Sequence, residues 1–562
     1  MTNAAEPRTG AQVLVDQLAL NGVDAIFAVA GESYLAVTDA LYDRAESITL
    51  YSCRQEGGAA FMAEATGKLT GCPGVCLVTR GPGATNASIG VHTAYQDSTP
   101  MLLLVGQVAR STMGREGFQE LDYEHVFSGL AKWAVQIDDA ARIPEIMHRA
   151  FTTAISGRPG PVVIALPEDM LVDVVSVRDG APAVAQRADA APEQITRLAA
   201  MVRDAERPLL IVGGSCWDQE TAAEILEFAT RWRIPMMTTF RRQDLVDNRS
   251  CAFAGALGPG LGAHLAPRVR MADLVVAIGG RLGEMTTGGY TLFGVPDPGV
   301  RMVHVHPDAA ELGRVYQAEL AINADPRTFV PRLADLEAPA EPRWDSWYSE
   351  SRRSYLELSE PSGESVGLDL ARVVRTISDT VPDDTVITNG AGNYTAWMHR
   401  YHRFAKHPTQ LGPTSGAMGY GLPAAVAAAA QDDTRLVIAF AGDGCMLMNG
   451  QELATVMRYG LRVIVIVVNN GHLGTIRMHQ EKRYPGRVIN TGLTNPDFVA
   501  FAESFGLWAE RVTQTDDFDA AFARARACGR AALLELITDP EQSTPDTLLS
   551  AVRNAAQEGN NR

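Results

Sequence analysis

Two short clusters of glycine, acidic and amide residues in the C-terminal third of the chain have the composition of a metal and phosphate site. The tripeptide Gly442–Gly444 (GDG) follows an apolar stretch, 435–441, and Asn470 follows another, 463–468. A segment with helical character separates the two stretches. The order is therefore strand, helix, strand, and a right-handed crossover makes the strands parallel. Asp443 and Asn470 are thus expected at one edge of a sheet, where their oxygen atoms suit Mg²⁺ or Ca²⁺.

The glycines of this cluster indicate phosphate binding. Gly442 and Gly444 carry no side chain, so backbone N–H groups can approach a phosphate closely, and the start of a helix favours an anion. Mg²⁺ that is held by one or two side chains usually shares its coordination shell with substrate phosphates. The alternative interpretation is an ordinary strand–helix–strand connection that is rich in glycine and asparagine.

Length and charge bound the classes of protein to which the chain can belong. Its 562 residues exceed the range of a single core, so several domains are expected. The net charge of −17 argues against a nucleic-acid partner. No apolar run approaches the length that spans a bilayer, and the N-terminus lacks a signal-peptide pattern, so we expect no membrane association. The seven cysteines are interpreted as reduced thiols of a cytoplasmic protein.

Two stretches rich in proline, 181–192 and 336–365, are interpreted as linkers. They leave three segments of domain size, 1–180, 193–335 and 366–545. Each segment alternates short apolar strands with helical patterns. The predicted fold class is therefore α/β, with three doubly wound domains whose sheets are largely parallel.

The middle segment has a Rossmann-like pattern but lacks a dinucleotide fingerprint. Its glycines, Gly258, Gly260 and Gly262, do not have the required spacing, and no strand is expected immediately before them. We therefore predict no NAD site in this segment.

The GDG cluster, about two dozen residues and then two asparagines resembles the signature of thiamine-diphosphate-dependent enzymes. The resemblance implies that thiamine diphosphate and Mg²⁺ are the cofactors. It also implies that the metal is bound by Asp443, Asn470 and the backbone carbonyl of His472. The segment 1–180 would then bind the pyrimidine of the cofactor, and 366–545 its diphosphate and Mg²⁺.

Glu56 is the catalytic residue that the resemblance implies. It lies in Arg54–Ala60 (RQEGGAA), a stretch similar to the family pattern R-H-E-x-x-A-A. In the family this glutamate exchanges a proton with the pyrimidine ring of the cofactor, which activates the thiazolium. The alternative is a glutamate that merely stabilises the start of a helix through the helix dipole.

Further cofactor contacts are implied by three more segments. A glycine-rich turn, 81–86, follows a strand, 389–393 (NGAGN) follows another, and 415–423 resembles the segment that holds the aminopyrimidine, with Met418 as the apolar residue that bends the cofactor. The implied cofactor-binding residues are Gly31, Gly83, Asn86, Asn389, Gly392, Asn393, Gly416, Met418, Gly442, Asp443, Gly444, Cys445, Asn470, His472, Leu473 and Gly474.

Within the family the chain is most similar to the acetolactate synthase branch, over essentially its whole length. The segments 117–120 (GFQE), 130–132 (LAK), 473–477 (LGTIR) and 495–498 (NPDF) carry this similarity. They imply a carboligase or lyase that decarboxylates or cleaves a 2-keto or 2-hydroxyacyl donor and transfers the acyl carbanion. The implied substrate residues are Phe118, Gln119, Lys132 and His479.

Two departures from that branch bear on the substrate and on the middle domain. His479 stands where the branch has Trp, and Met285 stands where it has the Arg that binds the carboxylate of a 2-keto acid acceptor. The alternatives are therefore a 2-hydroxyacyl-CoA lyase or oxalyl-CoA decarboxylase type enzyme, a flavin-dependent oxidase of the pyruvate oxidase type, or a cofactor-binding regulatory subunit. FAD or ADP would be held by the middle domain.

The resemblance also implies partners. The substrate is a small 2-keto acid or an acyl-CoA. The protein is expected to be a homodimer or homotetramer with its sites between subunits, each combining Glu56 of one chain with the Mg²⁺-diphosphate region of another.

Overall fold

The computed structural model describes residues 6–361, 363 and 365–560, and the chain folds into two compact units. Unit 1 comprises Met1–Gln186, Val426–Gln431 and Gln451–Tyr459. Unit 2 comprises Arg187–Ala425, Asp432–Gly450 and Gly460–Arg562. Unit 1 therefore includes two short segments from late in the sequence, whereas unit 2 contains most of the second half of the chain.

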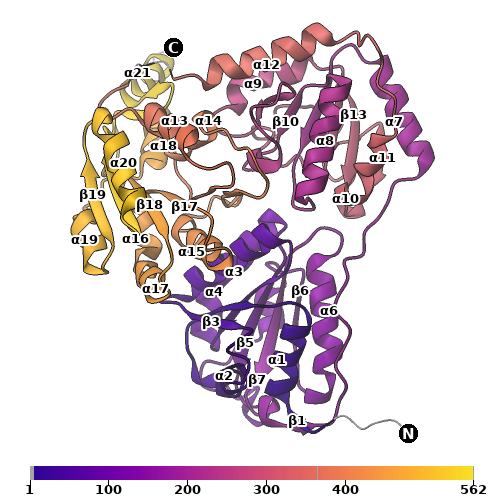
Figure 1. Ribbon diagram of the computed structural model, residues 1–562, viewed down its shortest axis with the longest axis vertical. Helices are drawn as coiled ribbons and strands as arrows, with labels where there is room; N and C mark the ends of the chain where they lie inside the picture. The colour runs from indigo at the N-terminus through magenta and orange to yellow at the C-terminus, as the bar shows by residue number, and fades with distance from the viewer. Residues whose placement is uncertain (1–5, 362, 364, 561–562) are drawn as a thin grey trace. The chain divides into compact units, whose positions relative to one another are not determined.

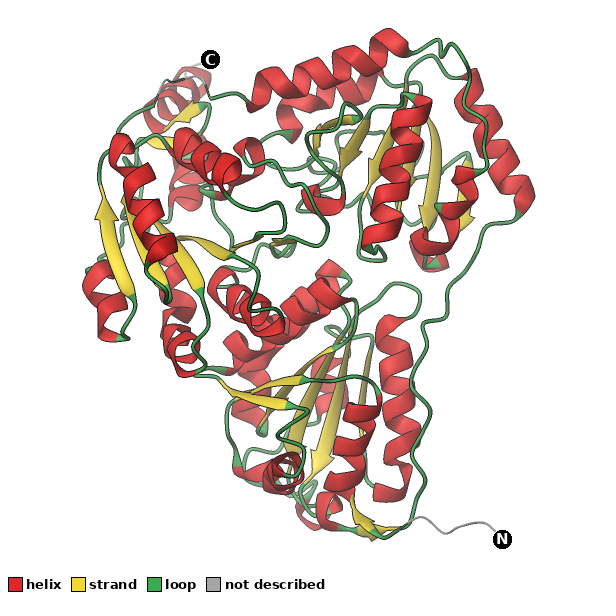
Figure 2. Ribbon diagram, in the orientation of Figure 1, coloured by secondary structure: helices red, strands yellow, loops and turns green. Residues whose placement is uncertain are grey.

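Three six-stranded sheets form the framework, and every strand pair in them is parallel (Figures 1 and 2). The first has the order β3 (Thr49–Ser52), β2 (Ala25–Ala28), β4 (Gly74–Val78), β5 (Met101–Gln107), β7 (Pro161–Pro167), β6 (Trp133–Gln136). The second has the order β11 (Phe253–Ala256), β10 (Met236–Thr238), β9 (Pro208–Val212), β12 (Leu274–Ile278), β13 (Arg301–His306), β14 (Leu320–Asn323). The third has the order β16 (Gln410–Leu411), β15 (Val386–Asn389), β17 (Val437–Gly442), β18 (Val463–Asn469), β20 (Ala532–Ile537), β19 (Trp508–Val512). The predicted α/β class with three parallel sheets is confirmed.

Helices cover both faces of the first sheet because its central strands are apolar on both faces. Helices α1 (Gly10–Leu20), α2 (Leu35–Tyr42) and α6 (Ile143–Ile155) share one buried cluster with alternate strand residues. Helices α3 (Glu56–Thr70) and α4 (Gly81–Asp97) pack against each other and contact β4 and β5. Glu56 is therefore carried by a helix that is anchored to the sheet.

The second sheet contains a strand that the sequence did not predict. Strand β11 ends at Ala256, with only Leu257 between it and Gly258, although no strand is expected there from the sequence. Its sequence, FAGA, is too short and too poor in β-branched residues to be recognised as a strand. Helix α9 (Gly262–Met271) then follows, so the glycines connect a strand to a helix.

The predicted linker 336–365 is wrong over half its length. Helix α12 (Asp345–Ser359) occupies it, and Trp347, Tyr348 and Tyr355 belong to the buried core of the second sheet. These aromatic residues recur at helical spacing, which outweighs the proline and charge content of the stretch. The other predicted linker contains no helix or strand from 181 to 191, and helix α7 (Pro192–Asp204) begins at its end.

The third sheet brings the predicted metal site together. Strands β17 and β18 are parallel neighbours, with Gly442 opposite Val468, so Asp443 and Asn470 leave the sheet at the same edge, as predicted. Helices α13 (Leu370–Thr380), α14 (Thr395–Tyr401) and α20 (Phe518–Ala527) bury apolar residues against this sheet. No helix within the described residues is long and apolar enough to cross a membrane.

Candidate active site

Asp443 lies directly after strand β17, as the first residue of helix α16 (Asp443–Asn449). Its side chain is 3% exposed. Oδ1 accepts the N–H of Gly444 at 2.9 Å, and Oδ2 accepts the N–H of Gly471 at 2.9 Å and Nδ2 of Asn495 at 2.8 Å. Burial raises the pKa of Asp443, and these hydrogen bonds oppose that shift.

Asn470 and His472 form a tight turn beside Asp443. Oδ1 of Asn470 accepts the N–H of His472 at 3.0 Å, and the backbone carbonyl of His472 accepts the N–H of Gly474 at 2.9 Å. Nδ1 of His472 lies 2.9 Å from the carbonyl oxygen of Asn470. The His472 imidazole therefore contacts the backbone of its own turn. The side-chain oxygen of Asn470 and the carbonyl oxygen of His472 each keep a second lone pair for a metal.

The oxygen atoms of this edge fit a hard divalent cation. Asp443 has three neutral donors and no ion-pair partner in the part of the chain that the structure describes. A buried carboxylate without a cation is unfavourable. Carboxylate, carboxamide and carbonyl oxygens together are the donor set that Mg²⁺ accepts.

The start of helix α18 (Gly474–Arg483) faces the same region. Its first backbone N–H groups have no carbonyl partner within the helix, which favours an anion. Thr475 joins this start to the loop after β15, because its hydroxyl accepts the N–H of Asn393 and donates to Oδ1 of Asn393, both at 2.9 Å.

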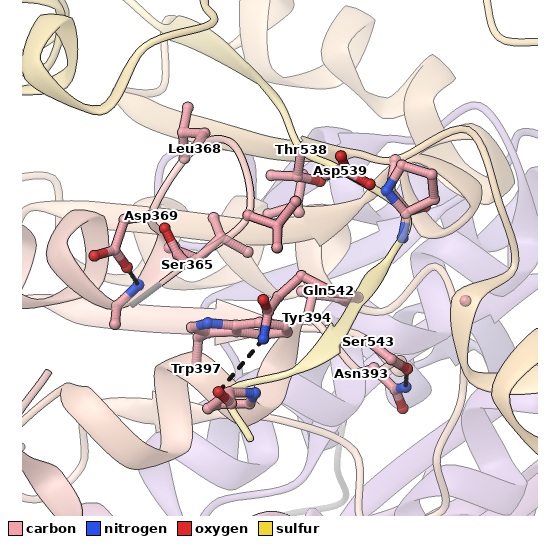
Figure 3. A pocket seen from close by; sticks show the side chains of 18 of the residues that line it. Ser365, Leu368, Asp369, Asn393, Tyr394, Trp397, Thr538, Asp539, Gln542 and Ser543 are labelled. Carbon is pink, nitrogen blue, oxygen red and sulfur yellow. Dashed lines mark hydrogen bonds between the residues drawn. The ribbon is translucent and has the colours of Figure 1, made fainter. Parts of the chain in front are cut away.

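A pocket adjoins this junction (Figure 3). Asn393, Asn470 and Gly474 line it together with residues of 538–545. Nδ2 of Asn393 donates to the hydroxyl of Ser543 at 2.9 Å, so a loop far along the sequence closes one side. Predicted diphosphate residues of two loops, after β15 and after β18, therefore line one hollow together with the unpredicted loop 538–545.

The glycine of the GDG cluster is packed against apolar side chains. A Cβ on Gly444 would lie 2.9 Å from Leu473 Cδ2, 3.3 Å from Leu493 Cδ1 and 3.5 Å from Met418 Cε. Met418, predicted to bend the cofactor, and Leu473 thus meet at Gly444. Gly416 precedes Met418 with a left-handed φ of 71° and has open space around it.

A buried tyrosine that the sequence did not point to, Tyr394, lies against Cys445 and Gly392. The Sγ of Cys445 donates to the carbonyl of Ala391 at 2.9 Å. The ring of Tyr394 fills the space at Gly392, where a Cβ would approach to 2.9 Å, and burial raises its pKa well above the usual value. Oδ1 of Asn389 is buried without a hydrogen-bond partner among the described residues.

In unit 1, Glu56 is the first residue of α3 and is half-buried. Its Oε2 accepts Nδ2 of Asn86 at 2.9 Å, and Oε1 lies 3.6 Å from where a Cβ on Gly83 would be. The stretch 81–86 is the start of helix α4, not the predicted turn, because Pro82 is favourable in a first helical turn. The predicted residues of both helices nevertheless meet at the Glu56 carboxylate.

Gly31, the remaining predicted cofactor residue, precedes a short 3₁₀ helix (Glu32–Tyr34). A Cβ there would approach Cβ of Thr79 to 2.5 Å. Glycine is thus required at this position by close packing against the end of β4.

Three of the predicted substrate residues, Phe118, Gln119 and Lys132, belong to unit 1, and His479 belongs to unit 2. Phe118 is 72% exposed, and Gln119 has a left-handed φ of 67° with its carbonyl bound to the N–H of Gly81 at 2.9 Å. Nζ of Lys132 donates to the carbonyls of Thr153 and Ser156 at 2.6 and 2.9 Å, at the end of α6. His479 is exposed on α18. Their roles remain predictions.

The sequence did not predict the hydrogen-bonded residues that hold the Asp443 side chain in place. Asn495 also donates to Oδ1 of Asn469 at 3.0 Å, and Asn469 donates to Oε1 of Glu535 at 2.8 Å. Glu535 is buried and accepts Nε of Arg511 at 2.6 Å. The only available signal was the 495–498 segment, noted for its similarity and not for a contact.

Family models match all three domains. Residues 8–126 match the N-terminal TPP binding domain of thiamine pyrophosphate enzymes, 195–333 match the central domain, and 390–536 match the C-terminal TPP binding domain. The Glu56 region and the Asp443 region thus fall within the two domains whose descriptions state cofactor binding.

Curated relatives give the same assignment. The chain is 33% identical to the acetolactate synthase large subunit of Parasynechococcus marenigrum over 529 residues, which cover 92% of this chain and 85% of the relative. It is 31% identical to acetolactate synthase isozyme 2 large subunit of Escherichia coli, covering 91% of this chain and 92% of the relative. A probable acetolactate synthase large subunit of Methanocaldococcus jannaschii is 31% identical, covering 95% and 93%. With these relatives and the matched domains, the chain belongs to the family of thiamine-pyrophosphate-dependent enzymes.

Proposed function

We propose that the protein is a Mg²⁺-dependent carboligase or lyase of the acetolactate synthase type. It decarboxylates or cleaves a 2-keto or 2-hydroxyacyl donor and transfers the acyl group. The observation that carries the proposal is the buried Asp443 carboxylate, which meets Asn470 and the His472 carbonyl at one sheet edge without a cation among the described residues.

Cofactor binding is assigned to residues of the third sheet. Asp443, Asn470 and the His472 carbonyl would hold Mg²⁺, and the start of α18 with Asn393 would bind the diphosphate.

Proton transfer is assigned to Glu56. Its carboxylate gives and takes the proton, and Asn86 fixes the position of its Oε2. When bound, thiamine diphosphate supplies a nucleophilic carbon and an electron sink for the carbon–carbon bond that breaks. The apolar surface of Met418 and Leu473 excludes water from the cofactor.

The functional protein is a homodimer or homotetramer, with each site combining Glu56 of one chain and Asp443 of another. The support is the family resemblance of both segments. Sedimentation at varied protein concentration tests the assembly: a monomer that is fully active contradicts it.

The first donor that we propose is pyruvate. CO₂ release and acetolactate are measured together, with purified protein, thiamine diphosphate and Mg²⁺. Formation of acetolactate supports a 2-keto acid acceptor despite Met285 and His479. Absence of turnover, with bound cofactor demonstrated, overturns the pyruvate assignment.

An acyl-CoA lyase is the second candidate, and a hollow in the second-sheet domain favours it. The hollow is lined by Gly258, Arg270, Met285, Thr286 and neighbouring residues, a glycine-rich strand-to-helix connection that suits the nucleotide part of CoA, ADP or FAD. Saturable turnover of a 2-hydroxyacyl-CoA without turnover of pyruvate supports this candidate. A yellow protein that consumes oxygen with a keto acid favours a flavin-dependent oxidase instead.

A further inference from the structure

The start of helix α3, which carries Glu56, is held by a carboxylate from late in the sequence. Oε1 of Glu452 accepts the N–H of Arg54 at 3.0 Å and the N–H of Gln55 at 3.1 Å. Gln55 is the N-cap of α3, and its own Oε1 accepts the N–H of Gly58 at 3.0 Å. One carboxylate therefore binds the two backbone amides that come directly before Glu56.

Glu452 is itself fixed. It is fully buried, and its Oε2 accepts the hydroxyl of Thr455 at 2.6 Å. Burial raises its pKa, and the hydrogen bonds from Thr455, Arg54 and Gln55 oppose that shift. A Cβ on Gly58 would lie 2.9 Å from Oε1 of Glu452, so only glycine allows the carboxylate to approach this closely.

A second contact orients the same segment. The hydroxyl of Tyr459 accepts the N–H of Ser52 at 2.7 Å and donates to the carbonyl of Leu50 at 3.1 Å. Its ring packs against Tyr51 with centroids 4.6 Å apart. The segment 452–459 is thus joined to β3 at one end and to the start of α3 at the other, within unit 1.

We propose that Glu452 is a positioning residue for Glu56. By binding the amides of Arg54 and Gln55, it fixes the backbone from which the Glu56 side chain projects, and thereby the direction of the carboxylate that moves the proton. This inference rests on the proposed function of Glu56. The positioning role makes proton transfer by Glu56 depend on Glu452, a residue that is not proposed to contact the cofactor or the substrate.

The test measures the rate at which the C2 proton of bound thiamine diphosphate exchanges for deuterium, at saturating cofactor and below the unfolding temperature. Glu452→Gln keeps an acceptor oxygen for the amides of Arg54 and Gln55 and places its amide NH₂ against the hydroxyl of Thr455. The exchange rate of this variant should stay within about threefold of the wild-type rate. Glu452→Asp withdraws the carboxylate by about one bond length and should lower the rate about tenfold or more, since small misplacements of a catalytic group are costly.

Glu64→Gln is the matched control. Glu64 is a buried carboxylate of the same helix, bound by Lys68 and Thr99, two turns beyond Glu56. Its substitution should lower stability without lowering the exchange rate. Exchange at the wild-type rate in folded Glu452→Asp, or an equal loss in Glu64→Gln, overturns the inference.

Glu56→Gln distinguishes failure of the proposed role of Glu56 from failure of the positioning role of Glu452. If it does not lower the exchange rate, the proposed function of Glu56 fails. If it lowers the rate while Glu452→Asp does not, only the positioning role of Glu452 fails. Glu452→Ala adds a third variant with no acceptor, and it is expected to lose at least as much as Glu452→Asp.

Discussion

The side chain of Asp443, the proposed metal ligand, is held in place by hydrogen bonds from its neighbours. Its buried carboxylate accepts three neutral donors, and Asn495 connects it through Asn469 to the Glu535–Arg511 pair. Arg511 forms ion pairs with both Glu535 and Asp497, whereas Asp443 has no ion-pair partner among the described residues. The support extends over residues that are far apart in sequence but adjacent at the sheet edge.

Removal of Asn495 should weaken metal binding without removing a ligand. In Asn495→Ala, Oδ2 of Asp443 loses its 2.8 Å partner, so we expect the apparent affinity for Mg²⁺ to fall about tenfold to a hundredfold. The measurement is a Mg²⁺ titration of cofactor binding, followed by quenching of tryptophan fluorescence. Unchanged affinity in a folded variant contradicts the support role. Asn554→Ala, at an exposed position of helix α21 (Leu549–Asn560), is the matched control.

Site residues that directly follow a strand could be predicted from the sequence, whereas site residues from other segments that contact them could not. Asp443 and Asn470 follow apolar strands, so parallel pairing alone places them together. Glu452 and Asn495 act through contacts with backbone amides or side chains whose partners no spacing rule identifies. Tyr394 likewise has the sequence context of an ordinary core residue.

At the scale of elements, most strands and helices follow from periodicity, and the errors have physical causes. The stretch 81–86 looks like a turn because it contains two glycines and a proline, yet Pro82 starts a helix. Strand β11 is short and contains small residues. Helix α12 was not predicted because prolines flank its sequence, although its aromatic residues recur at helical spacing.

Helix α12 should contribute strongly to the stability of unit 2. Trp347 is 5% exposed, and its Nε1 donates to the carbonyl of Pro208 at 2.9 Å, at the start of β9. Trp347→Ala should lower the free energy of unfolding by about 3–5 kcal/mol, because it leaves a large cavity. Urea unfolding followed by circular dichroism measures this.

Glu357→Ala, at an exposed position of the same helix, should change the free energy of unfolding by less than about 0.5 kcal/mol. Equal effects of the two substitutions would mean that α12 is not part of the core.

At the scale of the whole molecule, the second and third sheets belong to one compact unit because buried polar groups join them. Oδ2 of Asp244 accepts the N–H groups of Thr409 and Gln410 at 2.9 and 3.1 Å. Gln243 and Gln410 exchange hydrogen bonds at 2.8 and 3.1 Å. Three sheets were predictable, but this junction was not, because polar residues of this kind are usually exposed.

Buried histidines should make unit 2 sensitive to acid. Burial lowers the pKa of His399 and of His402 to about 3, and that of His306 to about 4. Between those values and about 6.5, the unfolded chain binds protons that the folded chain does not. Stability therefore rises with pH across this window and is lost on acidification, by about 1.4 kcal/mol per pH unit for each histidine.

Urea unfolding between pH 4 and pH 7 measures this dependence. His402→Asn should reduce the slope of the free energy of unfolding near pH 5 by about 1.4 kcal/mol per pH unit, the contribution of one proton, whereas substitution of the exposed, non-titrating Asn554 by Ala should leave the slope unchanged. An equal slope in the wild type and in His402→Asn would show that His402 is not held neutral by burial.

The assignment of Asp443 as a metal ligand is tested by thiamine diphosphate binding with and without Mg²⁺, measured by calorimetry in the wild type and in Asp443→Ala. We expect the wild type to bind the cofactor tightly only with Mg²⁺. Asp443→Ala, with an unchanged circular dichroism spectrum, should lose at least about a hundredfold in affinity. Binding of equal strength in the two proteins, or binding that does not depend on Mg²⁺, would contradict the assignment of this sheet edge as the metal-diphosphate site.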